Sequence, residues 1–267
     1  ARCSGGHRRL SARTAGASLM NTTAQRMRGY RGPALFSFGF RPFFLFASLW
    51  AALVVPLWTL AFTGILPASF ASRDWHVHEM LFGYLAGVIA GFLLTAVPNW
   101  TGRLPVVGTG LAGLFGLWLA GRAAMLIAPL LGPWAALIDS LFLVALALVI
   151  WREVLTGRNV RNLPVCVLVT LLAAANIAFH LRAPAPDALW IGERVALAVA
   201  VVLIALIGGR IVPSFTRNWM AKREMKPEPA PQDRFDLAIL VATRIALVVW
   251  LIAPLSLAAG VMLLAVG

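Results

Sequence analysis

Long apolar runs alternate with short polar segments along nearly the whole chain. A membrane-spanning helix needs roughly 20 predominantly apolar residues to cross about 30 Å of hydrocarbon, and several runs reach or approach this length. The predicted spans are Pro42–Leu66, Met80–Val97, Val106–Leu131, Trp134–Ile150, Leu163–His180, Leu189–Val212 and Leu237–Leu255. A further run, Leu257–Gly267, has the pattern of the start of an eighth span. The pattern therefore predicts an all-α, polytopic membrane protein.

The composition excludes a soluble globular domain. Of the 267 residues, 60% are apolar and only 12% are charged, and the mean hydropathy is +0.84. Soluble domains contain about 45–50% apolar and about 25% charged residues. The net charge of +13 is spread over short clusters between apolar runs, as in membrane proteins rather than nucleic-acid-binding proteins. We expect a lipid bilayer as partner and no nucleic acid.

The charges of the connecting segments predict the orientation. One set of segments is rich in basic residues and the alternate set is poor in them, so the positive-inside rule places the first set, with the N-terminus, in the cytoplasm. The rich set holds Arg26, Arg28, Arg31, Arg41, Arg103, Arg152, Arg158, Arg161, Arg217, Lys222, Arg223, Lys226 and Arg234. The poor set holds Arg73, Arg182 and Arg194.

The two ends of the chain suggest a fragment of a longer protein. Residues 1–19 have no apolar core and are not a secretory signal, so we expect a non-native or disordered leader with Met20 as a plausible start. Residues 20–41 are predicted to be a cytoplasmic segment. The transmembrane domain, residues 42–267, is expected to be incomplete because it stops within an apolar run.

Similar motifs recur between the two halves of the chain. The second and sixth spans end in Val97-Pro98-Asn99-Trp100-Thr101 and Val212-Pro213-Ser214-Phe215-Thr216. The third and seventh spans carry Arg122 and Arg244 before similar Leu-Ile-Ala-Pro-Leu sequences. These matches suggest a four-helix unit used in parallel, although apolar sequences also produce such matches by chance.

Three histidines provide the main candidate chemistry. His76 and His78 lie just before the second predicted span, and His180 lies at the end of the fifth. The predicted orientation places all three at the extracytoplasmic face, where imidazoles can bind haem iron, copper or zinc. His76 and His78 can share one metal only if Trp75–Glu79 is extended, because in a helix they point to nearly opposite sides. Interfacial histidines that face water are the alternative.

Ionisable side chains inside the spans are the second candidate set. Charged groups in lipid are costly and are functional candidates by default. Arg122 and Asp139 lie at depths that allow them to pair, and Arg244 lies in the seventh span. A structural ion pair, a proton or substrate relay, and contacts to porphyrin propionates are the alternatives. Asn176 lies one turn before His180 and shares its helix face, where it can orient that histidine.

Glycines follow one stripe of the second predicted span. Gly83, Gly87 and Gly91 recur at every fourth residue. This spacing favours either close helix packing, the commoner reason, or space for a flat porphyrin.

Other chemistries lack a sequence signature. Cys3 lies in the leader and Cys166 lies inside an apolar run, so we expect neither a disulfide nor a thiolate metal site. The sequence contains no Walker loop, no G-x-S-x-G and no H-E-x-x-H motif, which makes ATP-driven transport by this chain alone unexpected.

Several motifs together resemble the NnrS family. They are FGFRPFF at 38–44, WHVHEMLFG at 75–83, GFLLTAVPNWTG at 91–102, Gly121-Arg122, and the segment from Asn176 to His180. The resemblance covers the chain from about Ser37 to its end. It implies a bacterial inner-membrane protein of about twelve helices that contains haem and copper and is linked to the nitric oxide response and nitrosative stress in denitrifying cells.

The resemblance also implies site residues. His76, His78 and His180 are the metal-ligand candidates, and Arg41, Glu79, Asn99 and Trp100 are motif residues without an assigned role. Nitric oxide or a metal-nitrosyl species is the expected ligand; whether it is turned over, sensed or bound does not follow, and neither do enzyme activity and oligomeric state.

Two other functions remain open at this point. One is a quinol-linked membrane redox enzyme, which needs haem ligands on both sides of the membrane. The other is a secondary transporter that uses Arg122, Asp139 and Arg244.

Overall fold

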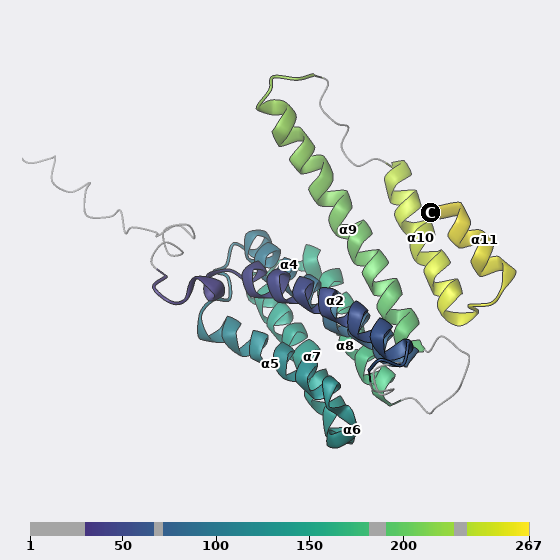
Figure 1. Cartoon of the computed structure of the whole chain (residues 1–267). Coiled ribbons are helices and arrows are strands. Elements are labelled where there is room, and N and C mark those ends of the chain that lie inside the picture. Colours follow the sequence, from purple (N-terminus) through teal and green to yellow (C-terminus); the bar gives the residue numbers. More distant parts are fainter. Residues whose placement is uncertain (1–29, 67–71, 182–190, 227–233, 267) are drawn as a thin grey trace, which may run out of the picture.

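The computed structural model describes residues 30–66, 72–181, 191–226 and 234–266. The expected leader, residues 1–19, and residues 20–29 of the expected cytoplasmic segment lie outside these ranges. All regular structure in the described residues is helical (Figure 1). Helices satisfy every backbone hydrogen bond internally, which is why they form where an apolar chain crosses lipid.

Seven helices or continuous helical segments are long and apolar enough to span a membrane, which confirms the predicted polytopic fold. Two short elements, η1 (Ala34–Ser37) and α6 (Ala128–Leu131), flank them, and a third, η4 (Val160–Asn162), opens the fifth span. The spans are α2 (Phe40–Phe62), α3–η3–α4 (Arg73–Thr101), α5 (Thr109–Leu126), α7 (Pro133–Thr156), η4–α8 (Val160–His180), α9 (Ile191–Ala221) and α10 (Arg234–Ile252). The expected start of an eighth span is the short apolar helix α11 (Leu257–Val266).

The second span begins earlier than the apolar pattern predicted. It starts as α3 (Arg73–His78), continues through the π-helical turns of η3 (Glu79–Leu85) and becomes α4 (Ala86–Thr101). The Ser72 hydroxyl caps its first turn by accepting a hydrogen bond from the Trp75 backbone N–H at 3.1 Å. The predicted start at Met80 was wrong because the polar residues of the first turns, Arg73, Asp74, His76, His78 and Glu79, lower the hydropathy there and mask the helix.

The helices pack mainly as neighbours along the chain. α2 packs on α4, α5 on α7, and α8 on both α7 and α9, while α10 and α11 form a hairpin beside α9 (Figure 1). Among the first four spans, α2 packs on α4 and α5 packs on α7. The next four helices pack in the same order, α8 on α9 and α10 on α11. The internal repeat suggested by the sequence motifs remains a prediction.

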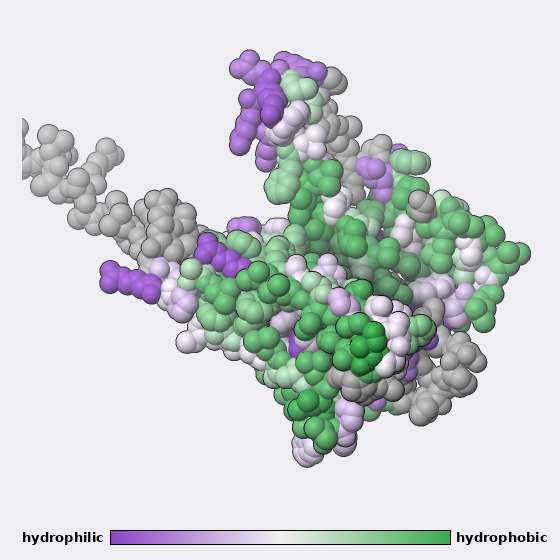
Figure 2. Space-filling view, in the orientation of Figure 1, coloured by the Kyte–Doolittle hydropathy of each residue, from purple (hydrophilic) through white to green (hydrophobic). Residues whose placement is uncertain are grey.

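The outer surface is apolar along the helices. On α2, Leu45, Leu49 and Leu53 are each about half exposed and form one outward-facing row. Figure 2 shows hydrophobic surface over the sides of the helices and hydrophilic residues gathered at the far end of α9. This distribution suits lipid as the surrounding solvent.

Candidate metal centre

His78 lies in the interior of the helical bundle. It is the last residue of α3, its side chain is fully buried, and its ring contacts the rings of Phe82, Phe179 and His180. The centroids of the His78 and His180 rings are 4.9 Å apart. Two histidines separated by 102 positions in the sequence therefore meet at one end of the bundle.

Asp139 joins these two histidines. It lies on α7 near the end of the bundle where α8 finishes, and its side chain is buried. Its Oδ2 atom lies 2.9 Å from Nε2 of His180 and 3.1 Å from Nε2 of His78. The same Oδ2 accepts a hydrogen bond from Nδ2 of Asn176 at 2.8 Å. The metal-ligating atoms of His78, Asp139 and His180 all lie within 4.8 Å of one another.

Arg122 and Glu79 complete a continuous polar network. Nη2 of Arg122 donates to Oδ1 of Asp139, and Nη1 donates to Oε2 of Glu79. The Trp50 indole donates to the same Glu79 oxygen at 2.8 Å. The other Glu79 oxygen, Oε1, lies 2.9 Å from Nδ1 of His78. We call His78, Glu79, Arg122, Asp139, Asn176 and His180 the buried polar cluster.

The hydrogen-bond partners of His78 require a proton or a metal ion at each of its two ring nitrogens. Nδ1 faces a Glu79 carboxylate oxygen and must carry a proton to donate to it. Nε2 faces two acceptors, Oδ2 of Asp139 at 3.1 Å and Oδ1 of Asn176 at 3.2 Å. A neutral imidazole protonated on Nδ1 would place a lone pair against those oxygens. Either a second proton or a metal ion at Nε2 resolves this conflict.

The formal charges lead to the same requirement. With neutral imidazoles, the cluster contains one cation, Arg122, and two carboxylates, Glu79 and Asp139, all of them buried. A net negative charge in a low-dielectric interior is costly. A second proton on His78 or a bound cation beside Asp139 offsets it.

His76 does not join the other two histidines. Trp75–Glu79 is helical, so the extended segment that a shared site required is not present. The His76 ring instead stacks on Trp58 with 4.4 Å between centroids and an interplanar angle of 30°. Its Nδ1 atom is buried without a hydrogen-bond partner among the described residues.

The other motif residues lie away from the cluster. Arg41 is exposed near the start of α2, where it donates to the Ala34 carbonyl at 2.9 Å and lies over the Phe38 ring. Asn99 and Trp100 are near the end of α4, at the opposite end of that span from His78. The structure thus does not bring these motif residues to the candidate centre.

The intramembrane charges divide into two groups. Arg122 and Asp139, which lie at depths that allow pairing, do form an ion pair. Arg244 lines a different, apolar cavity between α8, α9 and α10. Among the described residues, no contact joins Arg244 to Arg122 or Asp139, so the three do not form the single site that a transporter would use.

The glycine stripe serves close packing. A methyl group at Gly87 would come within 3.0 Å of the Ala47 side chain, and one at Gly91 would come within 2.7 Å of the Phe44 ring. At Gly83 it would lie 2.5 Å from Nη1 of Arg122 and 3.0 Å from Oε2 of Glu79. Side chains of α2 and α5 fill the space that a flat porphyrin would need.

Two roles were missed by the sequence reasoning. One is the hydrogen bond from Trp50 to Glu79. It joins two different helices, and the spacing of residues along the sequence does not predict such contacts. Glu79 was a motif residue without a role, although an acidic residue so close to an apolar span is itself a signal of a buried partner.

A small cavity lies against the cluster. It has a volume of about 250 Å³, and Ser72, Trp75, His78 and Phe179 are among the residues that line it. It lies at the same end of the bundle as His78, Asp139 and His180.

Buried imidazole and carboxylate groups inside a polytopic helical bundle define the class: an integral membrane protein with a candidate metal centre. The family model described as NnrS protein matches residues 34–267, and the chain belongs to this family. No curated protein and no solved structure matched the chain. Family membership supports a membrane protein linked to the nitric oxide response, with a metal-related function.

Proposed function

We propose that this protein binds copper at the buried polar cluster and protects bacteria against nitric oxide and its metal-nitrosyl products at the inner membrane. His78, His180 and Asp139 would hold the ion. The observation that carries the proposal is the convergence of their ligand atoms within 4.8 Å of one another inside the bundle. Two imidazoles and a carboxylate can hold several first-row metals, Cu(II) and non-haem Fe(II) among them, and the resemblance to the family is the reason for proposing copper.

The surrounding residues fit the requirements of such a centre. Nδ1–H of His78 donates to Glu79, which is the arrangement that commonly orients a metal-ligating histidine and raises its basicity. Asn176 fixes Oδ2 of Asp139 at 2.8 Å. Arg122 holds both carboxylates in place and offsets part of their charge.

The cluster also offers access for a small neutral molecule. The adjoining cavity of about 250 Å³ reaches His78, and nitric oxide is small, uncharged and soluble in lipid. A bound copper ion would supply an open coordination position and one-electron chemistry for such a ligand. His78 and Asp139, two of the residues that would hold the ion, are buried.

Haem, which the family resemblance also implies, does not fit the space around the cluster. The adjoining cavity is smaller than the roughly 300–1,000 Å³ of typical ligand pockets, and packed side chains occupy the glycine stripe. No step of the proposed function is therefore assigned to a haem at this site.

Metal analysis of the full-length protein, purified after expression with added copper, tests the proposal. We expect about one copper ion per chain at this site, an EPR spectrum with nitrogen splitting from imidazole, and loss of both in His78→Ala and His180→Ala. Asn99→Ala is the matched control, because this motif residue is exposed at the other end of α4. Copper content that is unchanged in both histidine variants would contradict the proposal.

A further inference from the structure

Two cavities adjoin at the end of the bundle opposite the buried polar cluster. The first, which we call the arginine cavity, has a volume of about 440 Å³, and the second, the phenylalanine cavity, has a volume of about 430 Å³. Trp100 and Arg210 line both. The arginine cavity is also lined by Asn159, Arg161, Asn162 and Arg217, and the phenylalanine cavity by Phe40, Phe44, Phe92, Ile211 and Phe215.

The arginine cavity concentrates positive charge without neutralising it. Three arginines from η4 and α9 line it, and no acidic residue lines either cavity among the described residues. Arg210 donates to Oδ1 of Asn162 at 2.9 Å, and the charges of Arg161 and Arg210 repel one another. Within the described ranges, no hydrogen bond or ion pair holds Arg161 or Arg217. Like charges that converge in a partly enclosed space favour a bound anion.

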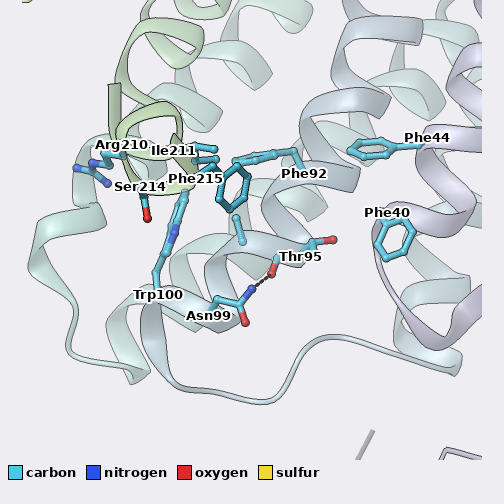
Figure 3. Close-up of a pocket in the computed structure, with 11 residues that line it drawn as sticks. Phe40, Phe44, Phe92, Thr95, Asn99, Trp100, Arg210, Ile211, Ser214 and Phe215 are labelled. Atoms are coloured by element: carbon cyan, nitrogen blue, oxygen red, sulfur yellow. Dashed lines mark hydrogen bonds between the residues drawn. The ribbon is translucent and has the colours of Figure 1, made fainter. Parts of the chain in front are cut away.

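The phenylalanine cavity extends this charged region into an apolar groove. Figure 3 shows Arg210 at one end of the cavity and Phe40 and Phe44 at the other, with Trp100 between Ser214 and Phe215. The groove is lined by α2, α4 and α9, whose flanks face lipid. A ligand that fills both cavities must therefore be anionic at one end and apolar along its length.

We infer that these cavities bind one anionic phospholipid of the cytoplasmic leaflet, with its phosphate in the arginine cavity and an acyl chain in the phenylalanine cavity. The guanidinium fork matches phosphate oxygens. Basic pockets between membrane helices on the cytoplasmic side are suited to anionic headgroups. The positive-inside rule assigns this end of the bundle to the cytoplasm, where these headgroups are exposed.

Lipid titration of the delipidated full chain in mild detergent tests the inference. Phosphatidylglycerol and phosphatidylcholine with the same acyl chains are added separately, and the thermal unfolding midpoint and bound lipid by native mass spectrometry are measured. We expect phosphatidylglycerol to raise the midpoint and to remain bound, whereas phosphatidylcholine has little effect. Arg161→Gln and Arg217→Gln should each weaken phosphatidylglycerol binding about fivefold, the magnitude expected for one arginine at an anionic surface.

Matched variants separate the headgroup from the chain. Arg223→Gln is the control for charge, because Arg223 lies over the Trp219 ring and lines neither cavity. Phe215→Ser should weaken binding of the lipid, and inorganic phosphate alone should not raise the midpoint. Since Arg161 is exposed and no described residue holds its side chain, Arg161→Gln tests the site even if a double variant does not fold.

Three results would overturn the inference. Equal binding of the two lipids would show that the headgroup charge does not contribute to binding. Unchanged binding in Arg161→Gln and Arg217→Gln would show that the phosphate does not bind in the arginine cavity. Phosphate alone acting as strongly as the lipid, with Phe215→Ser without effect, identifies a free-anion site instead. Copper content should not change in any of these variants, which separates this test from that of the proposed function.

Discussion

Oδ2 of Asp139 lies 2.9 Å from Nε2 of His180, although 41 positions separate the two residues. α7 and α8 are consecutive helices packed side by side, so the start of α7 and the end of α8 lie at the same end of the bundle. Asp139 and His180 are each placed near that end of their helices. Their contact, together with that of His78 to Asp139, creates the candidate metal centre.

Loss of Arg122 should strongly destabilise the protein. Arg122→Gln leaves Glu79 and Asp139 as buried carboxylates without their cation, and breaking a buried pair in this way costs about 3–5 kcal/mol. Thermal or denaturant unfolding in detergent measures the change. Arg103→Gln is the control: Arg103 pairs with Glu153 at the other end of the bundle with 37% of its side chain exposed, and Glu153 keeps a second cation, Arg152, so removal of Arg103 should cost less than the loss of Arg122.

The same network predicts that the costs of two substitutions do not add. In the wild-type protein, Glu79→Gln removes one of the two carboxylates that pair with Arg122. In the Arg122→Gln background, the same substitution removes a buried carboxylate that has already lost its cation. We therefore expect Glu79→Gln to be less destabilising, or even stabilising, in that background. Additive free energies of unfolding would show that Arg122 and Glu79 do not act as a pair.

Because Gly83 has no side chain, the guanidinium group of Arg122 can lie against it. In Gly83→Ala, the new methyl group would lie 2.5 Å from Nη1 of Arg122, so the guanidinium must move away from Glu79. Overpacking of this kind costs about 1–3 kcal/mol, and copper retention should fall with it. Gly116→Ala on α5 is the matched control, because nothing lies within 4 Å of the added methyl group. Equal unfolding midpoints for the two variants would contradict the packing described for Gly83.

Asn176 should tune the metal affinity without being a ligand. Its Nδ2 donates to the Asp139 oxygen that faces both histidines, and loss of such a supporting hydrogen bond typically lowers metal affinity about 10–100-fold. We expect this decrease for Asn176→Ala when copper is titrated against a competing chelator. Thr170→Val on the same helix is the control, since Thr170 bonds to Trp151 and to the Cys166 carbonyl instead. An unchanged affinity in Asn176→Ala would remove it from the centre.

The sequence predicted the number of spans and the end of the bundle at which the polar residues meet. Apolar run lengths suffice for the spans, and the alternation of consecutive helices places His78, Asp139 and His180 at one end. The rotation of each helix about its axis was not predictable, because these helices are apolar on nearly all sides. The contacts of Arg122 with Glu79 and of Glu79 with Trp50 depend on that rotation.

The position of His76 depended on one local feature, the helix start at Arg73. The hydropathy profile placed the span start at Met80, which left the conformation of Trp75–Glu79 open. The Ser72 cap begins the helix before both histidines, so His76 and His78 point in different directions. The prediction of three converging imidazoles thus becomes two converging imidazoles and a carboxylate.

This difference gives a direct comparison between His76 and His180. If copper is held by His78, Asp139 and His180, His76→Ala should retain the copper that His180→Ala loses, and its EPR spectrum should be unchanged. His76→Ala removes the stack on Trp58, which is worth about 0.5–1.5 kcal/mol, and His76→Phe should restore most of that stability. Equal loss of copper in His76→Ala and His180→Ala, with His76→Phe unable to restore it, would show that His76 is a ligand. The candidate centre would then need a different arrangement of the first turns of the second span.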